Sequence, residues 1–580
     1  MTLARFSLPF LALLALAPAQ DPAFRFVPKD AALVVRMGAP ARWKKDFADT
    51  ALAKLMAAPA LQPMMAQVSE AMTAMMTEAR GSGFDADALE RMVADYQGDL
   101  VMSIAVDWKK ADLVTMGDED PSMPFAITIA ATPHPSYDLA ALAKAIDASM
   151  QKMLDEPDAP KSKELAIGEL RLRAVADTGE AGMWGTVPAM VDGHLVMFFG
   201  NDVEAHATKA IEGKDRFEAA EAAGAPMFVH GDVRGFVGAL EDSMAELEEM
   251  GAAPFDFGDL LDTMGLRAME SMRMTVGAEG KHLVADLKMG LRGDKRGAMA
   301  MLPQTKAQPK LLRLLPASAS NWTVTQLDLG VLYATAEQFV TLLEAEMPMS
   351  WADMMTAMAD ELKVRLKEDL LDHLGGEMLL LNDADPEAEL DDDSPLAAIG
   401  DMCMVFSLRD GAAFGKSVET MLRARGLHAA RKTEEYQGAK IHRMTLLATI
   451  PLEYAVTDDL LLLAIGDGER SRASLRGVLD AKASGTPTEL PAEAKAHMEA
   501  APAGWCGVGM TRPAETMAGL AKAMSEAAAL GGEDDEDAGQ LGMIGSVLEA
   551  VAGEMKRLGI ETSMAFVYSG PQGIGYRLRW

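Results

Sequence analysis

The 580-residue sequence has only two cysteines, Cys403 and Cys506, which excludes a disulfide-rich scaffold. Both fall on expected strands, and two interpretations stay open. They are either buried thiols that pack as small apolar side chains, or one disulfide, which needs Cα atoms about 4.4–6.8 Å apart. No Cys-x-x-Cys pair is present, so thiol redox chemistry of the thioredoxin kind is not expected.

Basic residues are also scarce, with 54 Lys and Arg against 87 Asp and Glu and a formal net charge of −33. Nucleic acids and anionic membrane surfaces are bound by clustered cations, so we expect neither as a partner. Acidity of this size is first a solubility feature, and second an indication of cations or basic partners.

Catalytic motifs are missing as well. None of the nine histidines forms a His-Glu-x-x-His pattern, and the sequence has no nucleophile elbow, phosphate loop or complete dinucleotide fingerprint. His194 is interpreted as structural. We therefore predict no catalytic and no cofactor-binding residue, although an enzyme is not excluded.

The first residues predict export. Arg5 supplies a positive charge, Phe6 to Ala17 is apolar, and Ala17-Pro18-Ala19 offers the small residues of a cleavage site. We predict a signal peptide at 1–19 and a periplasmic or extracellular protein. No later run reaches about 18 apolar residues, so we expect no integral membrane span after cleavage.

An internal echo predicts the domain organisation. Ala189 to Gly200 aligns without a gap with Ala455 to Gly466, and each copy is typical of a strand, a tight turn and an apolar strand. The surrounding order of strands and helices repeats. We predict two tandem, duplicated domains, 20–292 and 313–580, joined by a linker at 293–312.

Short hairpin connections favour antiparallel pairing, and the helical runs do not alternate strictly with strands. The predicted fold class is α+β, with one antiparallel sheet or two in each domain and helices packed on one face.

Two groups of residues are candidate sites. The acidic stretch containing Asp383, Asp385, Glu387 and Asp391 could bind calcium, but Ala388 occupies the place where a calcium loop has glycine, so solvated loops are the better interpretation. Methionines cluster on two equivalent expected helices, as Met72, Met75, Met76 and Met354, Met355, Met358. Such residues fill cores or form an adaptable apolar binding face.

Phe26 to Asp30, the His373 to Glu377 entry to a strand and the hairpin at Asp458 resemble a family of large exported bacterial proteins known only as a domain of unknown function. The resemblance implies no catalytic residues. Duplicated domains without paired polar chemistry favour a non-enzymatic binding or structural protein of the envelope as the first hypothesis, with an unidentified envelope protein or an apolar, lipid-like ligand as partner.

The alternative hypothesis is a hydrolase that uses carboxylates far apart in sequence. Asp192 with Asp458, or Asp99 with Glu377, would form the pair. Turn geometry explains Asp192 and Asp458 more simply, since Asp is favoured in tight turns.

Overall fold

The computed structural model describes most of the chain. The described residues are 23–62, 95–109, 125–155, 159–176, 183–213, 216–217, 225–249, 256–303, 308–344, 347–382, 402–446, 450–466, 469–487, 489–530, 536–560, 562–571 and 573–580. The predicted signal peptide lies outside them.

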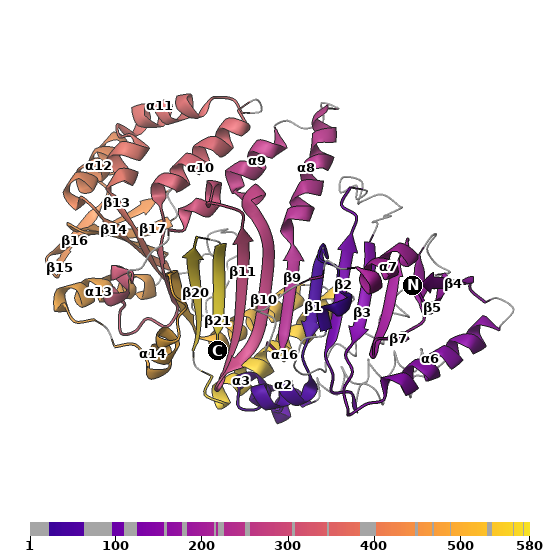
Figure 1. The fold of residues 1–580 in the computed structure, drawn as a ribbon. Coiled ribbons are helices and arrows are strands. Elements are labelled where there is room, and N and C mark those ends of the chain that lie inside the picture. Colours follow the sequence, from indigo (N-terminus) through magenta and orange to yellow (C-terminus); the bar gives the residue numbers. More distant parts are fainter. Residues whose placement is uncertain are drawn as a thin grey trace. The chain divides into compact units, whose positions relative to one another are not determined.

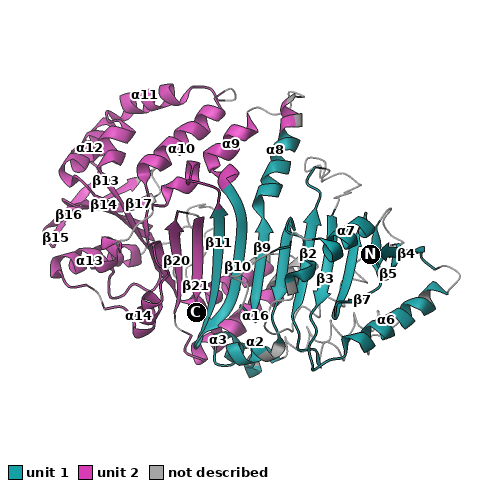
Figure 2. Cartoon of the chain, in the orientation of Figure 1, with its two compact units in different colours: residues 1–244, 269–290 teal, residues 245–268, 291–580 magenta. Residues whose placement is uncertain are grey.

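The chain divides into two compact units (Figures 1 and 2). Unit 1 comprises Met1–Met244 and Met269–Gly290, and unit 2 comprises Ala245–Ala268 and Leu291–Trp580. Residues 245–268 thus belong to unit 2, although they precede the last strands of unit 1 in the sequence.

Unit 1 is built on antiparallel strands. They are β1 (Leu33–Met37), β2 (Leu100–Val106), β3 (Phe125–Ala131), β4 (Ser162–Ile167), β5 (Leu170–Ala176), β6 (Trp184–Thr186), β7 (Ala189–Val191), β8 (His194–Gly200), β9 (Met227–Asp232), β10 (Met269–Glu279) and β11 (His282–Leu291). Hydrogen-bonded neighbours follow the order β10, β9, β1, β2, β3, β8. Beyond β3, strand β8 also pairs with β7 and with β6. Strand β6 pairs with β5, and β5 pairs with β4.

Within the described residues, the helices of unit 1 are α2 (Pro40–Phe47), α3 (Ala51–Met56), α6 (Leu139–Leu154), α7 (Val203–Glu212) and the first part of α8 (Val233–Glu249). Leu195, Met197 and Phe199 of β8 pack in a core with α6, whereas Val196 and Phe198 pack in another with α7. Successive residues of a strand point to opposite faces, so α6 and α7 cover opposite faces of this sheet.

Unit 2 has strands β12 (Trp322–Gln326), β13 (Leu374–Asn382), β14 (Met402–Leu408), β15 (Lys432–Tyr436), β16 (Ala439–Leu446), β17 (Ile450–Val456), β18 (Leu460–Ile465), β19 (Trp505–Thr511), β20 (Ser563–Gly570) and β21 (Gly573–Arg579). Their antiparallel order is β21, β20, β19, β12, β13, β14, β18, β17, β16, β15. Strands β20, β19, β12, β13, β14 and β18 take the places that β10, β9, β1, β2, β3 and β8 take in unit 1.

The helices of unit 2 are α9 (Phe257–Met264), α10 (Leu329–Leu342), α11 (Trp351–Leu362), α12 (Gly411–Ala424), α13 (Glu469–Ser484), α14 (Ala492–Glu499), α15 (Pro513–Leu530) and α16 (Glu536–Arg557). Leu460 and Leu462 of β18 lie in the core that contains α13, and Leu461 lies in the core that contains Phe414 of α12. The α+β class is confirmed. The expectation that helices pack on one face is wrong, because the central strands are apolar on both sides and both faces need cover.

The two cysteines do not form a disulfide, and both are buried. Cys403 lies on β14 and Cys506 on β19, with β13 and β12 between them. Three strand spacings are about 14 Å, well beyond disulfide reach. The interpretation as buried thiols is confirmed.

The echoed hairpins are both present. In the first, Val191 pairs with His194, and Asp192 and Gly193 have φ of 49° and 84°, the left-handed pair that a tight two-residue turn requires. In the second, Thr457 donates its backbone N–H to Leu460 O at 2.8 Å across Asp458 and Asp459. His194 is buried, and burial lowers its pKa.

Among the helices that the structure describes, none combines the length and apolar character needed to cross a membrane.

His206 of α7 gives unit 1 a pH-dependent stability. Its Nε2 lies 2.8 Å from Thr128 Oγ1, and burial, followed by the nearby Lys209 charge, lowers its pKa to about 4. Between pH 4 and 6.5 the unfolded chain therefore binds a proton that the folded chain does not, so stability rises with pH in that window. We expect His206 to cost unit 1 up to about 3 kcal/mol at pH 4 relative to pH 7.

Urea unfolding of wild type and His206→Gln at several pH values measures this cost. The variant should lose part of the pH dependence between 4 and 6.5, and His134→Gln in the same unit should behave as wild type. Equal slopes for wild type and His206→Gln would contradict the assignment.

Candidate functional site

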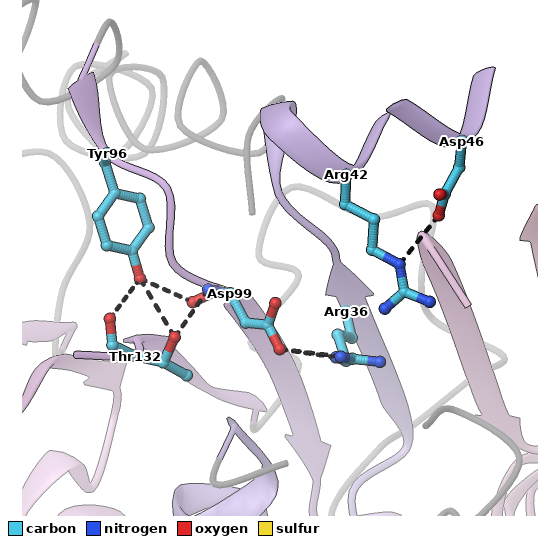
Figure 3. Close-up of polar contacts among 6 residues, drawn as sticks. All are labelled: Arg36, Arg42, Asp46, Tyr96, Asp99 and Thr132. Carbon is cyan, nitrogen blue, oxygen red and sulfur yellow. Dashed lines mark hydrogen bonds and ion pairs between the residues drawn. The ribbon is translucent and has the colours of Figure 1, made fainter. Parts of the chain in front are cut away.

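Asp99, one of the predicted hydrolase carboxylates, lies in a buried polar network of unit 1 (Figure 3). Arg36 of β1 donates from Nη2 and Nε to Asp99 Oδ2 at 2.9 and 3.2 Å. Both side chains are 1% exposed. A carboxylate that is closed off from solvent and held by a guanidinium has the environment of a structural ion pair and no path for a substrate.

Tyr96 and Thr132 fix the backbone beside this ion pair (Figure 3). The Tyr96 hydroxyl lies 2.7 Å from Thr132 O and 3.0 Å from Asp99 O, and Asp99 N donates to Thr132 Oγ1 at 2.7 Å. Burial raises the pKa of Tyr96 far above its usual range. A Cβ at Gly98 would lie 2.2 Å from the Tyr96 hydroxyl oxygen, so only glycine fits there.

The other predicted carboxylates also have structural partners within their own units. Glu377 Oε2 accepts the backbone N–H groups of Lys310 and Leu311 at 2.7 and 3.1 Å, at the start of a short 3-10 helix. Asp192 is exposed and pairs with Arg25. Asp458 is exposed in its turn, and its carbonyl accepts Gly411 N at 3.0 Å.

The calcium candidates Asp383, Asp385, Glu387 and Asp391 lie outside the described residues, and so do Met72, Met75 and Met76. Met354, Met355 and Met358 lie on α11 and are half-buried.

Helices α10 and α11 form a hairpin with well-defined ends. Asp328 Oδ1 accepts the N–H groups of Gly330 and Val331 at 3.0 and 3.1 Å, which caps α10. Ser350 Oγ accepts Asp353 N at 3.1 Å, which caps α11. The Tyr333 and Trp351 rings meet edge to face with centroids 5.6 Å apart, joining the two helices.

This hairpin is unusual in its exposure. Although both helices are described throughout, neither contains a buried residue. Leu332 and Phe339 of α10 are 44% and 41% exposed, and Met347 and Met349 in the connecting turn are 37% and 44% exposed. We call these four residues the apolar hairpin surface. A helix as apolar as α10 is normally buried, so this surface is the strongest candidate for a binding site.

A cavity of about 640 Å³ is the second candidate, and it lies within unit 2. Its walls come from α12, β16, β17 and α13, and include Val418, Glu419, Lys440, His442, Tyr454 and Lys482. The volume falls in the range of about 300–1,000 Å³ that is usual for small-molecule sites. Asp458 is the one predicted site residue that lines it.

The polar side chains Glu419, Tyr454 and His442 of this cavity have partners just outside its lining. Arg431 pairs with Glu419, and its Nη1 lies 3.1 Å from the Tyr454 hydroxyl. His442 Nδ1 lies 2.8 Å from Thr433 Oγ1. Burial, reinforced by the Arg431 charge, lowers the pKa of His442, so its imidazole is neutral at pH 7.

Comparisons with known proteins add little. No protein-family model matches the sequence, and no curated protein matches it. Among solved structures, crystal form I of TP0453 aligns with 47% of this chain and 80% of its own, at 8% identity and a TM-score of 0.21. Crystal form III aligns with 52% and 89%, at 8% identity and a TM-score of 0.22. Similarity at this level does not establish a shared fold.

The exposure of Leu332 and Phe339 was missed by the sequence reasoning. Their apolar character predicts burial, and only the packing shows that these two side chains stay exposed. The cavity residues Glu419, His442 and Tyr454 were missed because they come from separate elements and form no motif. The sequence offered little signal, because α10 carries Glu337, Gln338 and Thr341 at the spacing of the polar face of an ordinary surface helix.

Proposed function

We propose that this protein is a non-enzymatic binding protein of the bacterial envelope, exported through its N-terminal segment, which uses the apolar hairpin surface of unit 2 to hold a partner. The observation that carries the proposal is the exposure of Leu332 and Phe339 on a helix with no buried residue. Exposed apolar patches on soluble proteins mark interaction sites, because covering them releases ordered water.

The wider architecture supports a binding role. Each predicted carboxylate pair is divided between the two units, and the carboxylates of Asp99, Glu377 and Asp192 have partners in their own units. These contacts leave the hydrolase hypothesis without a supporting observation. The resemblance to the family of unknown function implies no activity that would argue otherwise.

We also propose that the two units are copies of one ancestral domain. The support is the matching strand order, together with the echo of Ala189 to Gly200 in Ala455 to Gly466. Asp99 precedes β2 in unit 1, and Glu377 lies on the matching strand β13. In this proposal, unit 1 has the buried Arg36–Asp99 ion pair at this position, whereas in unit 2 Glu377 caps the first turn of a 3-10 helix.

A second candidate function is the carriage of a small ligand in the cavity of unit 2. The volume of the cavity is large enough for such a ligand. Its lining includes the polar side chains of Glu419, Lys440, His442 and Lys482, which favour a polar ligand over a lipid-like one.

Removal of the apolar hairpin surface tests the first proposal. We expect Leu332→Ser/Phe339→Ser to lose a partner that the wild type captures from an extract of its native envelope, since each side chain buried on binding contributes about 1.5–3 kcal/mol. Both positions are exposed, so the folding stability should change by no more than about 0.5 kcal/mol for each substitution.

Leu520→Ser on α15 is the matched control, because Leu520 is 45% exposed in the same unit. It should capture what the wild type captures. Identical capture by all three proteins would show that the hairpin is not the binding element.

A further inference from the structure

The geometry of the hairpin points to a partner of defined chemistry. We propose that the α10–α11 hairpin binds a cationic amphipathic helix, with the apolar stripe of α10 taking its apolar face and the acidic stripe of α11 taking its basic flank. This inference rests on the proposed binding function and adds the class of the partner.

The apolar half of the site is a stripe along α10. Leu332, Ala336 and Phe339 are exposed at positions i, i+4 and i+7, which lie on one face of a helix. Met347 and Met349 extend the exposed apolar area into the turn. Methionine is flexible and polarizable, so it adapts to side chains of different shape. A helix laid along such a stripe is a common form of peptide recognition.

The acidic half comes from α11. Its exposed face presents Asp353, Thr356, Ala357 and Asp360 at helical spacing. Every charged side chain from 329 to 362 is acidic, namely Glu337, Glu344, Glu346, Asp353, Asp360 and Glu361. Among the described residues, Glu361 pairs with Arg425, whereas Asp360 makes no ion pair. The hairpin therefore carries exposed acidic side chains on α11 and an exposed apolar stripe on α10.

The negative charge of the hairpin also favours a cationic peptide over a membrane as the partner. Envelope lipids with anionic headgroups repel an acidic surface, and the chain as a whole carries −33. A helix with Lys or Arg beside its apolar face gains both the burial of apolar area and the attraction of opposite charges. The acidic stripe would select such a helix from other apolar partners.

Three synthetic peptides of about 18 residues, roughly five helical turns, test the inference with the full chain. One is an amphipathic Leu/Lys helix, one is the same design with Glu for Lys, and one keeps the lysines but has Ser for Leu. Vesicles of phosphatidylcholine, with and without phosphatidylglycerol, are measured in parallel. Fluorescence anisotropy of the labelled peptides gives the affinities at low and high salt.

We expect the Leu/Lys peptide to bind at least about tenfold more tightly than either other peptide, with an affinity that falls as salt rises. Leu332→Ser/Phe339→Ser should abolish binding, and Asp353→Asn/Asp360→Asn should remove the preference for Lys over Glu. Leu520→Ser and Glu435→Gln, which change exposed residues elsewhere in unit 2, are the matched controls and should have no effect.

Equal binding of the Leu/Lys and Leu/Glu peptides, both lost in Leu332→Ser/Phe339→Ser, would overturn the charge selection and leave the apolar binding function standing. Hairpin-dependent binding to vesicles without peptide binding would replace the peptide by a membrane. Peptide binding that is unchanged in Leu332→Ser/Phe339→Ser would overturn both proposals, since the hairpin would then take no part.

Discussion

Asp99→Asn destabilises unit 1 by about 3–5 kcal/mol, because it leaves the Arg36 guanidinium buried without its counter-charge. Asn has nearly the shape of Asp, so the loss reports charge and not packing. The ion pair is 1% exposed on both sides, and Arg36 lies on β1 between β2 and β9, where water cannot replace the carboxylate. Urea unfolding followed by hydrogen exchange of unit 1 peptides measures the loss for that unit alone.

Two variants make this expectation specific. Asp46→Asn breaks the Arg42–Asp46 pair in α2, which is partly exposed and should contribute no more than about 0.5 kcal/mol. Arg36→Met/Asp99→Leu removes both charges and should recover most of the loss, since an apolar pair needs no compensation. If Asp99→Asn costs no more than Asp46→Asn, the ion pair is not buried as described.

Glu453→Ala should destabilise unit 2 by about 1.5–3 kcal/mol, less than the loss for Asp99→Asn, because the carboxylate is buried but the three guanidiniums that it holds are 24–46% exposed. Glu453 is 4% exposed on β17. Its Oε1 accepts from Arg443 Nε at 2.7 Å and lies 3.3 Å from Arg472 Nε, and its Oε2 lies 3.7 Å from Arg476 Nη1. Without the Glu453 carboxylate, three positively charged guanidiniums lie around the space that its side chain occupied. Hydrogen exchange should show the loss in unit 2 peptides and leave unit 1 unchanged.

Glu434→Gln is the matched control for Glu453. Glu434 also pairs with Arg476, at 2.6 Å, but it is 55% exposed. An exposed pair contributes about 0–1 kcal/mol, so the control should cost far less than Glu453→Ala. Similar losses for the two variants would show that burial does not set the strength of this cluster.

Part of the fold followed from local pattern. The hairpin at Asp192-Gly193 was predictable because two left-handed residues in a tight turn leave few choices of side chain. The antiparallel α+β class followed from short connections between apolar strands. The helices on both faces were not foreseen. An unbroken apolar run such as Leu195 to Phe199 indicates that both faces of the strand are covered, but not which segment covers each face.

The candidate site was harder to predict. The methionines of α11 drew attention by composition, but Met354, Met355 and Met358 are half-buried within the hairpin. The exposed residues are instead Leu332 and Phe339, which have no unusual feature in the sequence. Exposure depends on what packs against a helix, and that depends on contacts with distant segments.

The sequence by itself determined the strands, the turns, the acidity and the internal echo, since these depend on residues near one another along the chain or on composition. Tertiary structure alone decided that Asp99 is neutralised by Arg36, that Cys403 and Cys506 are three strands apart, and that Leu332 and Phe339 of α10 are exposed. The physical reason is common to all three. Burial, charge compensation and exposure are properties of neighbours in space, and strand order sets which neighbours meet.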